Sequence, residues 1–372
     1  MNRRTLATVG GGVVLAGIGG AIVVGSGSGP SGGSGGLMRA VRQAPVTLRG
    51  DVGGEKLDFI RNPDVVRLLD SRYAVTLDVR RAGSMEMART PSPGVDFIWP
   101  AHDTAADIAK NLRGQPKAEE NVFSSPLVIL TWKPVSDALT RAALVETRDG
   151  THYLTKLREL VEMSLASRTW ASLGLTDVFG AVNVVSTHPA LSNSGLMFAS
   201  LVAGLLNGGR PPSSSEVEKV GPAIRTLFER QGRMEDSSGR VFRQFLSQGM
   251  GAFPLLVAYE NQLTEYWESV PENERRMLVD RVRVLYPVPT MFATHPLMAL
   301  TDKGRRLVEA LRDPEIRAIA WTRHGYRFPG SEALPAPAAA RALGMPATPG
   351  AVMPMPSAAV VEDMLTRYIP AN

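Results

Sequence analysis

The sequence predicts an α/β fold, and three observations support this. From Pro45 onward, short runs rich in apolar and β-branched residues alternate with helical runs, which is typical of a mainly parallel sheet covered by helices. The chain has 372 residues, which is enough for two domains of ordinary size. Hydrophobic residues make up 44% and charged residues 21%, so the composition is that of a globular protein and not of a disordered one.

The N-terminus is the clearest local signal. Arg3 and Arg4 precede a stretch without charge from residue 6 to 24, and a bilayer core needs roughly 20 apolar residues. Positive residues before such a span keep that end in the cytoplasm and place the remainder outside. We therefore expect residues 1–25 to be a signal-anchor or a cleaved signal peptide, exported by the Sec or the twin-arginine route. Retention gives a single-pass membrane protein, and cleavage gives a periplasmic or secreted one.

Residues 26–44 are expected to form a flexible tether, since Gly and Ser dominate up to residue 36. A tether is useful only if the anchor stays, so it favours retention.

The first part of the exported region predicts strands that alternate with helices. A strand over 46–49 leads through a Gly-rich turn into a helix that ends near residue 59. Asn62 and Pro63 begin a second helix, because Asn favours the N-cap and Pro the first helical position. Pro100 ends a strand over 96–99. Further strands are expected over 74–79 and 127–132, with a helix after Gly83 and Ser84.

The middle of the chain is more helical. Apolar periodicity predicts helices over 153–166, 196–207, 216–231 and 240–247, separated by short strands over 181–186 and 255–259. A strand over 282–286 ends at Pro287, and helices follow over 302–311 and 315–322. The Pro- and Ala-rich segment 335–356 is expected to run in extended form, before an amphipathic helix over 358–368.

Several polar turns lie at the junctions between these elements. Ser192, Asn193 and Ser194 start a long apolar helix, and Ser84 starts an earlier one. Free N–H groups at such helix starts attract anionic or carbonyl groups. Because these turns converge at the strand ends of an α/β sheet, we expect a crevice there that binds a small polar ligand. Comparable junctions carry Gly53 and Gly54, Ser124 and Ser125, and Tyr259 and Glu260.

Six segments form an ordered set of landmarks between about residues 45 and 328. They are Gly50-Asp51-Val52-Gly53-Gly54-Glu55-Lys56, Phe123-Ser124-Ser125-Pro126-Leu127, Ser192-Asn193-Ser194-Gly195, Tyr259-Glu260, Leu285-Tyr286-Pro287 and His324-Gly325-Tyr326-Arg327. In this order they resemble the bacterial extracellular solute-binding proteins of the type II periplasmic-binding-protein fold. The resemblance covers nearly the whole exported part.

The resemblance implies two Rossmann-like lobes, joined by two crossing strands, which close on a ligand through a hinge. The expected division places residues 45–134 and 288–372 in one lobe and residues 135–287 in the other. It implies a monomer without a cofactor that captures a small polar solute for uptake through an ABC permease. An oxyanion or a carboxylate is favoured as the solute, and a sugar or a peptide end is the alternative. The expected ligand-binding residues are Gly53, Gly54, Ser84, Ser124, Ser125, Ser192, Asn193, Ser194, Tyr259 and Glu260.

Two departures from the family's pattern leave another function open. Relatives carry small hydroxyl residues where this chain has Ala101-His102-Asp103, and an acid where it has His188. The alternative is a membrane-anchored sensor or protein-interaction ectodomain that kept the fold without transport. His102 and His188 are candidates for cleft residues that make ligand binding pH-sensitive, or else for structural histidines.

Composition and motifs argue against other classes of function. The chain has no cysteine and no His-Glu-x-x-His spacing, so we expect neither a cysteine nucleophile nor a zinc site. Its 41 Lys and Arg are interleaved with 36 Asp and Glu, so we expect no nucleic-acid partner. Glu260 is a candidate general base without an identified partner, and we expect no catalysis.

Overall fold

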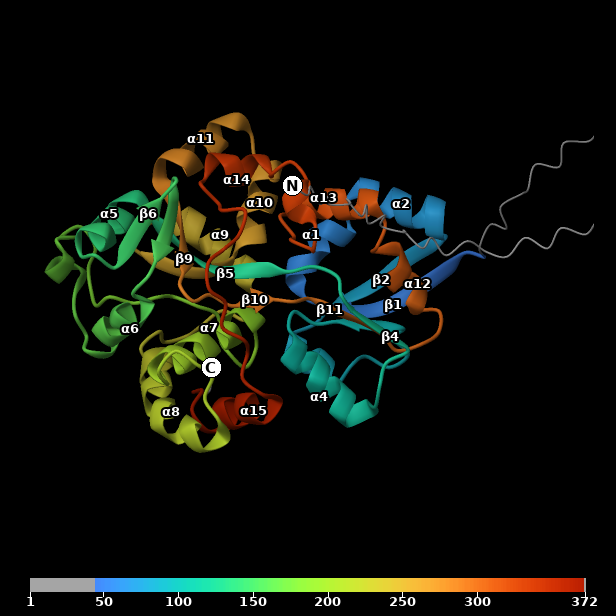
Figure 1. Cartoon of the computed structure of the whole chain (residues 1–372), viewed down its shortest axis with the longest axis horizontal. Helices are drawn as coiled ribbons and strands as arrows, with labels where there is room; N and C mark the ends of the chain where they lie inside the picture. Colours follow the sequence, from blue (N-terminus) through green and yellow to red (C-terminus); the bar gives the residue numbers. More distant parts are fainter. Residues whose placement is uncertain (1–43, 371–372) are drawn as a thin grey trace, which may run out of the picture. The chain divides into compact units, whose positions relative to one another are not determined.

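Two β-sheets organise the part of the chain that this computed structural model describes, residues 44–370 (Figure 1). The first sheet has the strand order β2-β1-β3-β11-β4. β1 pairs in parallel with β2 and β3, and β11 runs antiparallel to β3 and β4. The strands are β1 (Val46–Val52), β2 (Val75–Arg81), β3 (Phe97–Trp99), β4 (Ala118–Asn121) and β11 (Pro296–Ala299).

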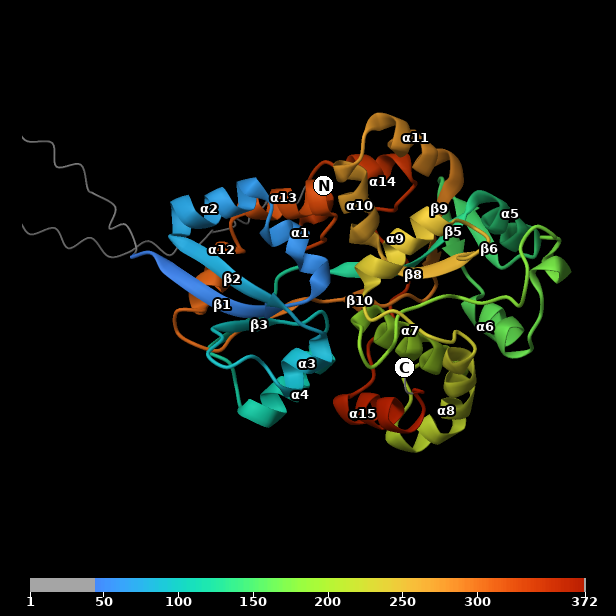
Figure 2. The ribbon, with the colours of Figure 1, turned by 180° about the vertical axis from the view of Figure 1, so that it is seen from behind.

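Helices cover both faces of this sheet (Figure 2). One face carries η1 (Gly54–Lys56), α1 (Leu57–Ile60), α2 (Pro63–Tyr73), α12 (Arg305–Ala310) and α13 (Pro314–His324). The other face carries α3 (Ser84–Arg89) and α4 (Asp103–Arg113). As predicted, the Asn62 side chain caps α2 by accepting a hydrogen bond from the Asp64 N–H at 3.0 Å. We call the first sheet with these helices the first lobe.

The second sheet has the order β10-β5-β9-β7-β6, with β8 paired to β5. Its strands are β5 (Ser125–Trp132), β6 (Val145–Arg148), β7 (Thr151–Leu154), β8 (Leu255–Tyr259), β9 (Val282–Pro287) and β10 (Phe292–Ala293). The chain crosses from the first sheet between β4 and β5 and returns between β10 and β11. These two crossings match the arrangement that the family resemblance implies.

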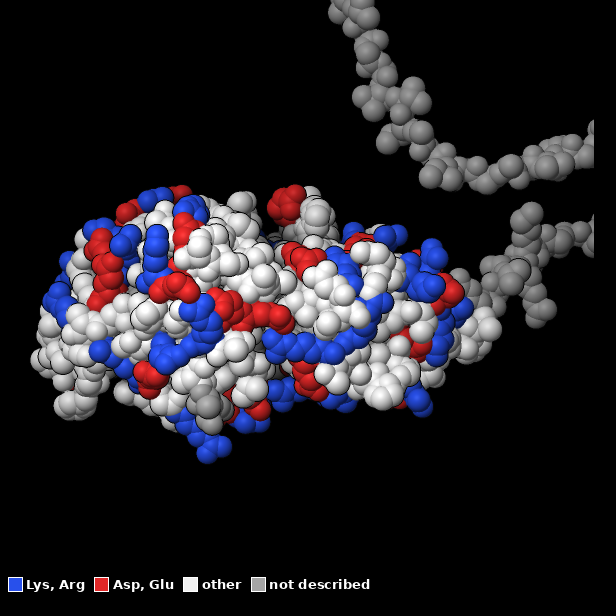
Figure 3. Space-filling view, turned by 90° about the horizontal axis from the view of Figure 1, so that it is seen from below, with Lys and Arg blue, Asp and Glu red and all other residues white. Residues whose placement is uncertain are grey.

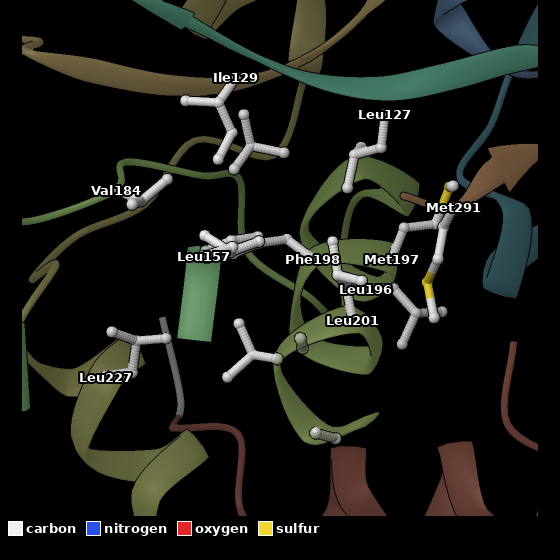
Figure 4. Packing of buried hydrophobic residues seen from close by; sticks show 14 of the residues in the cluster. Leu127, Ile129, Leu157, Val184, Leu196, Met197, Phe198, Leu201, Leu227 and Met291 are labelled. Atoms are coloured by element: carbon white, nitrogen blue, oxygen red, sulfur yellow. The ribbon is translucent and has the colours of Figure 1, made fainter. Parts of the chain in front are cut away.

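The helices of the second lobe surround this second sheet. They are α5 (Lys133–Arg141), α6 (Leu157–Leu165), η2 (Trp170–Leu173), α7 (Asn193–Leu206), α8 (Ser214–Glu229), α9 (Ser238–Gln248), α10 (Glu260–Ser269), α11 (Glu272–Arg281) and α14 (Ala338–Ala342). α7 is apolar on all sides and is buried along almost its whole length, as expected of a helix inside a core. Its Phe198 packs beneath Leu127 and Ile129 of β5 (Figure 4).

The C-terminal segment, residues 346–370, contacts both lobes, and we call it the C-terminal strap. Thr290, between the lobes, donates its N–H to the Ala351 carbonyl at 2.9 Å and accepts from the Met353 N–H at 2.7 Å. α15 (Ala358–Arg367) then packs against α4 of the first lobe and α8 of the second (Figure 1). An exposed ion pair of 3.2 Å between Arg89 and Glu362 adds a further link to the first lobe.

Several sequence predictions need correction. Antiparallel pairs predominate in the described sheets, so the mainly parallel arrangement is wrong, because β5 runs against β8, β9 and β10. No strand forms over 181–186, where only isolated bridges at Ala181 and Val185 occur. The helix predicted from residue 153 begins at Leu157, because Thr151–Leu154 pairs with β6 and β9. The expected lobe boundaries at residues 134 and 288 remain a prediction.

The predicted signal segment and almost all of the tether lie outside the described residues. Among residues 44–370, no helix is both long and apolar enough to cross a membrane. One face of this part carries acidic and basic side chains interspersed, without a large area of either sign (Figure 3).

Candidate functional site

Three helices begin around a cavity of about 80 Å³ between the two lobes. α3 and α4 belong to the first lobe and α7 to the second. The cavity, which we call the inner cavity, is lined by residues 83–86, 102, 189–193 and 196. The first N–H groups of each helix have no partner within the helix, and the helix dipole places partial positive charge there. The helix starts therefore direct hydrogen-bond donors and partial positive charge toward the inner cavity, whose lining includes one charged residue, Glu86.

His102 is the N-cap of α4 and the most buried polar side chain of the inner cavity. Its Nδ1 accepts a hydrogen bond from the Ala105 N–H at 3.2 Å, and only 1% of the residue is exposed. Burial, together with the positive charge of Lys56, lowers the pKa of His102 to about 3. The ring is therefore neutral at ordinary pH, and its single proton sits on Nε2 because Nδ1 is an acceptor. No atom of the described chain accepts a hydrogen bond from this Nε2.

The inner cavity opens into a larger one of about 420 Å³, which we call the outer cavity. Both cavities share the linings Gly83, Ser84, Glu86, Leu191, Ser192 and Asn193. The outer cavity adds Gly53, Gly54, Glu55 and Arg81 from the first lobe and Asp236, Ser237 and Ser238 from the second. Across it, the Arg81 guanidinium lies 3.9 Å from the Asp236 carboxylate. Residues of both lobes thus line each of the two adjacent cavities.

A buried ionic cluster lies beneath the cleft at the ends of β1 and β11. The Lys56 ammonium, which is fully buried, pairs with Glu55 and lies 5.7 Å from the ring centroid of Trp99. Burial lowers the pKa of Lys56, and the Glu55 carboxylate opposes this. His295 Nδ1 lies 3.8 Å from Glu55 Oε1. Burial and the nearby Lys56 charge hold the pKa of His295 well below its usual range.

Buried polar atoms without a hydrogen-bond partner gather around these elements. They include His102 Nε2, Asn193 Oδ1, Asn261 Nδ2 and Oδ1, Thr294 Oγ1, and both ring nitrogens of His295. Few buried polar side-chain atoms in proteins lack a partner, and leaving one unpaired costs about 1–3 kcal/mol. Two of these residues, His102 and Asn193, line the inner cavity, where a polar ligand can pair with their free atoms.

Five of the predicted ligand-binding residues line the cleft. Gly53 and Gly54 line the outer cavity only, while Ser84, Ser192 and Asn193 line both cavities. The Ser84 hydroxyl accepts a hydrogen bond from the Ala101 N–H at 3.0 Å, so it also fixes the turn that leads to His102.

Three other predicted residues lie behind the cleft and support it. Ser194 is buried against Thr187, with the two hydroxyl oxygens 2.7 Å apart. The Ser125 hydroxyl accepts from the Asn261 N–H at 3.3 Å. The Tyr259 hydroxyl accepts from Asn193 Nδ2 at 2.7 Å, which fixes the orientation of the Asn193 amide. These residues do not line either cavity, and their role in ligand binding stays a prediction.

Ser124 and Glu260 also lie outside the lining of both cavities. Ser124 forms an isolated bridge with Arg327 near the crossing strands. Both oxygens of the Glu260 carboxylate accept from the Arg327 guanidinium, at 2.8 and 3.0 Å. Tyr286 donates to the same carboxylate at 2.5 Å. Each oxygen of the Glu260 carboxylate therefore already accepts a hydrogen bond within the chain, and its role in ligand binding stays a prediction.

Of the histidines considered from the sequence, His102 lies in the cleft and His188 does not. His188 Nδ1 accepts from the Ala190 N–H at 3.2 Å, and its Nε2 lies 3.0 Å from the Pro370 carbonyl oxygen. Lys56 and His295 were not predicted as parts of the site. Nothing in the sequence marks them, because their burial arises only when η1, β3 and β11 meet. Among residues 44–370, no group of three or more His, Asp or Glu could hold a metal ion.

Replacing Gly195 with alanine is expected to displace the start of α7. A Cβ there would overlap the backbone carbonyl of Thr187, which cannot move aside as a flexible side chain could. We expect a loss of about 1–3 kcal/mol in the free energy of unfolding, measured by chemical denaturation. The matched control is Gly239→Ala near the start of α9, where the nearest atom to a Cβ is 3.7 Å away. That variant should be unchanged or more stable, and equal effects of the two substitutions would contradict the close approach at Gly195.

The chain was compared with known families, sequences and structures. No protein-family model matches the chain, and no curated protein matches its sequence. A protein assigned as an extracellular solute-binding protein from Bordetella parapertussis matches with a TM-score of 0.54 at 9% identity, over 87% of this chain and 99% of that chain. The sulfate-binding protein SubI from Mycobacterium tuberculosis H37Rv has a TM-score of 0.49 at 12% identity, over 88% and 100%. The periplasmic molybdate-binding protein of Azotobacter vinelandii has a TM-score of 0.45 at 12% identity, over 76% of this chain and 99% of that chain.

These findings define the class of structure. The chain has the two-lobed α/β fold of the type II periplasmic solute-binding proteins, which confirms the fold predicted from the sequence. Since one fold can host unrelated functions, the function has to be argued from the site.

Proposed function

We propose that the protein is an extracytoplasmic solute-binding protein that captures a small anionic solute between its two lobes without catalysis. The observation that carries this proposal is His102 Nε2, a buried N–H donor without a partner, where three helix N-termini meet. A donor of this kind is satisfied by an acceptor oxygen of a ligand. The helix starts favour that oxygen further if it is negatively charged.

The charges around the site suit an anion in spite of the buried acid nearby. Glu55 is paired with Lys56, so the two charges largely cancel. His102 is neutral and donates without adding charge. Each helix dipole contributes about 0.3–1 kcal/mol, and a hydrogen bond to a charged group about 1.5–3 kcal/mol. Together these terms favour a small oxyanion or a carboxylate over a neutral ligand at this position.

Capture is proposed to occur by closure of the lobes about the two crossings. The expected division sets residues 45–134 and 288–372 against residues 135–287. Closure is driven by the ligand only to the extent that the ligand binds the closed form more tightly than the open one. Since α3 and α4 lie on one side of the inner cavity and α7 on the other, an anion that contacts all three contributes this difference in affinity.

The location and partners follow from the same proposal. The described residues would lie outside the cytoplasmic membrane, on a tether and an N-terminal segment that is either retained or cleaved. A monomer would deliver its solute to an ABC permease.

Replacing His102 with asparagine is expected to weaken anion binding by about 10- to 100-fold, which corresponds to loss of one hydrogen bond to a charged group. Asparagine is a favoured N-cap, so α4 should still begin at the same residue. The measurement is calorimetric titration of the full-length chain in detergent with sulfate, phosphate, glycerate and glycerol 3-phosphate.

The control variant is His152→Asn, a histidine on β7 whose Nδ1 lies 2.9 Å from Thr147 Oγ1, away from both cavities. It should bind as the wild type does. Unchanged binding by the His102→Asn variant would contradict the proposed site. Absence of binding by the wild type across the panel would contradict solute capture and favour a sensor or partner-binding ectodomain.

A further inference from the structure

The inner cavity offers both a donor and an acceptor to its ligand. His102 Nε2 is the donor, and its residue is only 1% exposed. Asn193 Oδ1 is a buried acceptor, because the amide nitrogen of the same side chain donates to Tyr259. A fully deprotonated inorganic oxyanion can only accept hydrogen bonds, so it would leave Asn193 Oδ1 unpaired and bind less tightly. A ligand that carries an O–H or N–H group next to its anionic group satisfies both atoms.

The volumes of the two cavities also favour a ligand that extends beyond a single anionic group. The inner cavity of about 80 Å³ is well below the roughly 300–1,000 Å³ of ordinary small-molecule sites. With the outer cavity of about 420 Å³, the combined space reaches that range. The lobes already meet across it, because a Cβ at Gly83 of the first lobe would lie 3.2 Å from the Leu191 carbonyl oxygen of the second. The outer cavity is therefore present while the lobes are in contact.

The walls of the outer cavity suit a polar tail. Glu55, Glu86 and Asp236 line it together with a single basic residue, Arg81. Glu55 is occupied by Lys56, and Glu86 accepts from Arg80 at 2.7 Å. Asp236 is about half exposed, and its carboxylate lies 3.9 Å from Arg81 and 3.5 Å from Arg240. Both distances exceed that of a hydrogen bond, so Asp236 can accept from a hydroxyl or amino group of a ligand.

We propose that the solute is a small organic anion with hydroxyl or amino groups, whose anionic group lies in the inner cavity and whose tail lies in the outer cavity beside Asp236. This inference rests on the proposed function and specifies its ligand class. It distinguishes such a solute from a bare inorganic oxyanion. Asp236 acts as a specificity residue for the tail and does not contact the anionic group.

The test compares ligands that share an anionic group but differ in the tail. The full-length chain in detergent is titrated with sulfate and acetate, which carry no hydrogen-bond donor at neutral pH, and with glycerate, glycerol 3-phosphate, phosphoethanolamine and inorganic phosphate. At least one organic ligand with a hydroxyl or amino tail should bind about tenfold or more tightly than sulfate or acetate. Equal or tighter binding of the bare anions would overturn this inference and leave the proposed function intact. No binding of any probe at millimolar concentration would overturn both.

The Asp236→Asn variant tests where the tail of the ligand lies. Asp236→Asn is expected to weaken phosphoethanolamine binding by about tenfold, because a charge-assisted hydrogen bond is lost, and to leave phosphate binding within about twofold. Asp302→Asn, at an exposed aspartate of the first lobe outside both cavities, is the matched control and should change neither affinity. If Asp236→Asn changes the affinity for the two ligands equally or not at all, the tail does not lie beside Asp236 and the inference fails.

Discussion

Replacing Arg327 with methionine is expected to lower the free energy of unfolding by about 3–5 kcal/mol. Arg327 and Glu260 form a bidentate ion pair in which the residues are only 8% and 2% exposed. Methionine fills much of the same space but leaves the Glu260 charge buried, with Tyr286 as its remaining donor. The loss should be visible in guanidinium unfolding followed by circular dichroism.

Two controls separate this effect from a general loss of charge. Arg158→Met removes one partner of an exposed pair on α6 and should change the free energy of unfolding by less than about 0.5 kcal/mol. The double variant Arg327→Met with Glu260→Gln removes the uncompensated charge and should recover part of the loss. A loss below about 1 kcal/mol for Arg327→Met would contradict the buried pair. A Glu260→Gln variant that folds normally but no longer binds solute would support the ligand-binding role predicted from the sequence.

The folded protein is expected to lose stability steeply as the pH falls below about 6.5. Burial lowers the pKa of His102 to about 3 and that of His324 to about 4, and holds the pKa of His295 well below its usual range. An unfolded histidine titrates near 6.5, so below this pH the unfolded chain binds protons that the folded chain does not. The contribution of these neutral histidines to the free energy of unfolding is therefore fully present above about pH 6.5, and it decreases as the pH falls toward 4.

Three such groups give a slope of up to about 4 kcal/mol per pH unit. Glu265 opposes this slope, since burial raises its pKa and the folded state gains from its protonation. Guanidinium unfolding at a series of pH values between 7.5 and 4.5 measures the net effect. The His102→Asn variant, which keeps an N-cap but cannot titrate, should reduce the slope by about one proton, or about 1.4 kcal/mol per pH unit. An unchanged slope would show that His102 is protonated in the folded state.

The part of the site that could be predicted from the sequence lies at the ends of secondary-structure elements. Gly53, Gly54, Ser84, Ser192 and Asn193 sit at such ends, and their positions follow from the local pattern. The strand ends of an α/β sheet lie at one edge, so the local sequence pattern was sufficient to predict that these residues lie close together.

The remaining parts of the site depend on contacts between distant residues. Glu260 lies at a polar junction as the ligand-binding candidates do, but its partner Arg327 is 67 residues away. His295 reaches Glu55 only because β11 returns to the first sheet beside β3. The direction of β5 relative to β8 and β9 is likewise set by the crossing between lobes. The apolar periodicity within one segment does not reveal contacts between residues that are far apart in the sequence.

The C-terminal strap connects the two lobes in addition to the two crossings, because α15 packs against both α4 and α8 (Figure 1). The inner cavity shares six lining residues with the outer cavity, beside Arg81 and Asp236. A solute that leaves the inner cavity on this side therefore passes between Arg81 of the first lobe and Asp236 of the second, and its release requires that this contact lets it through.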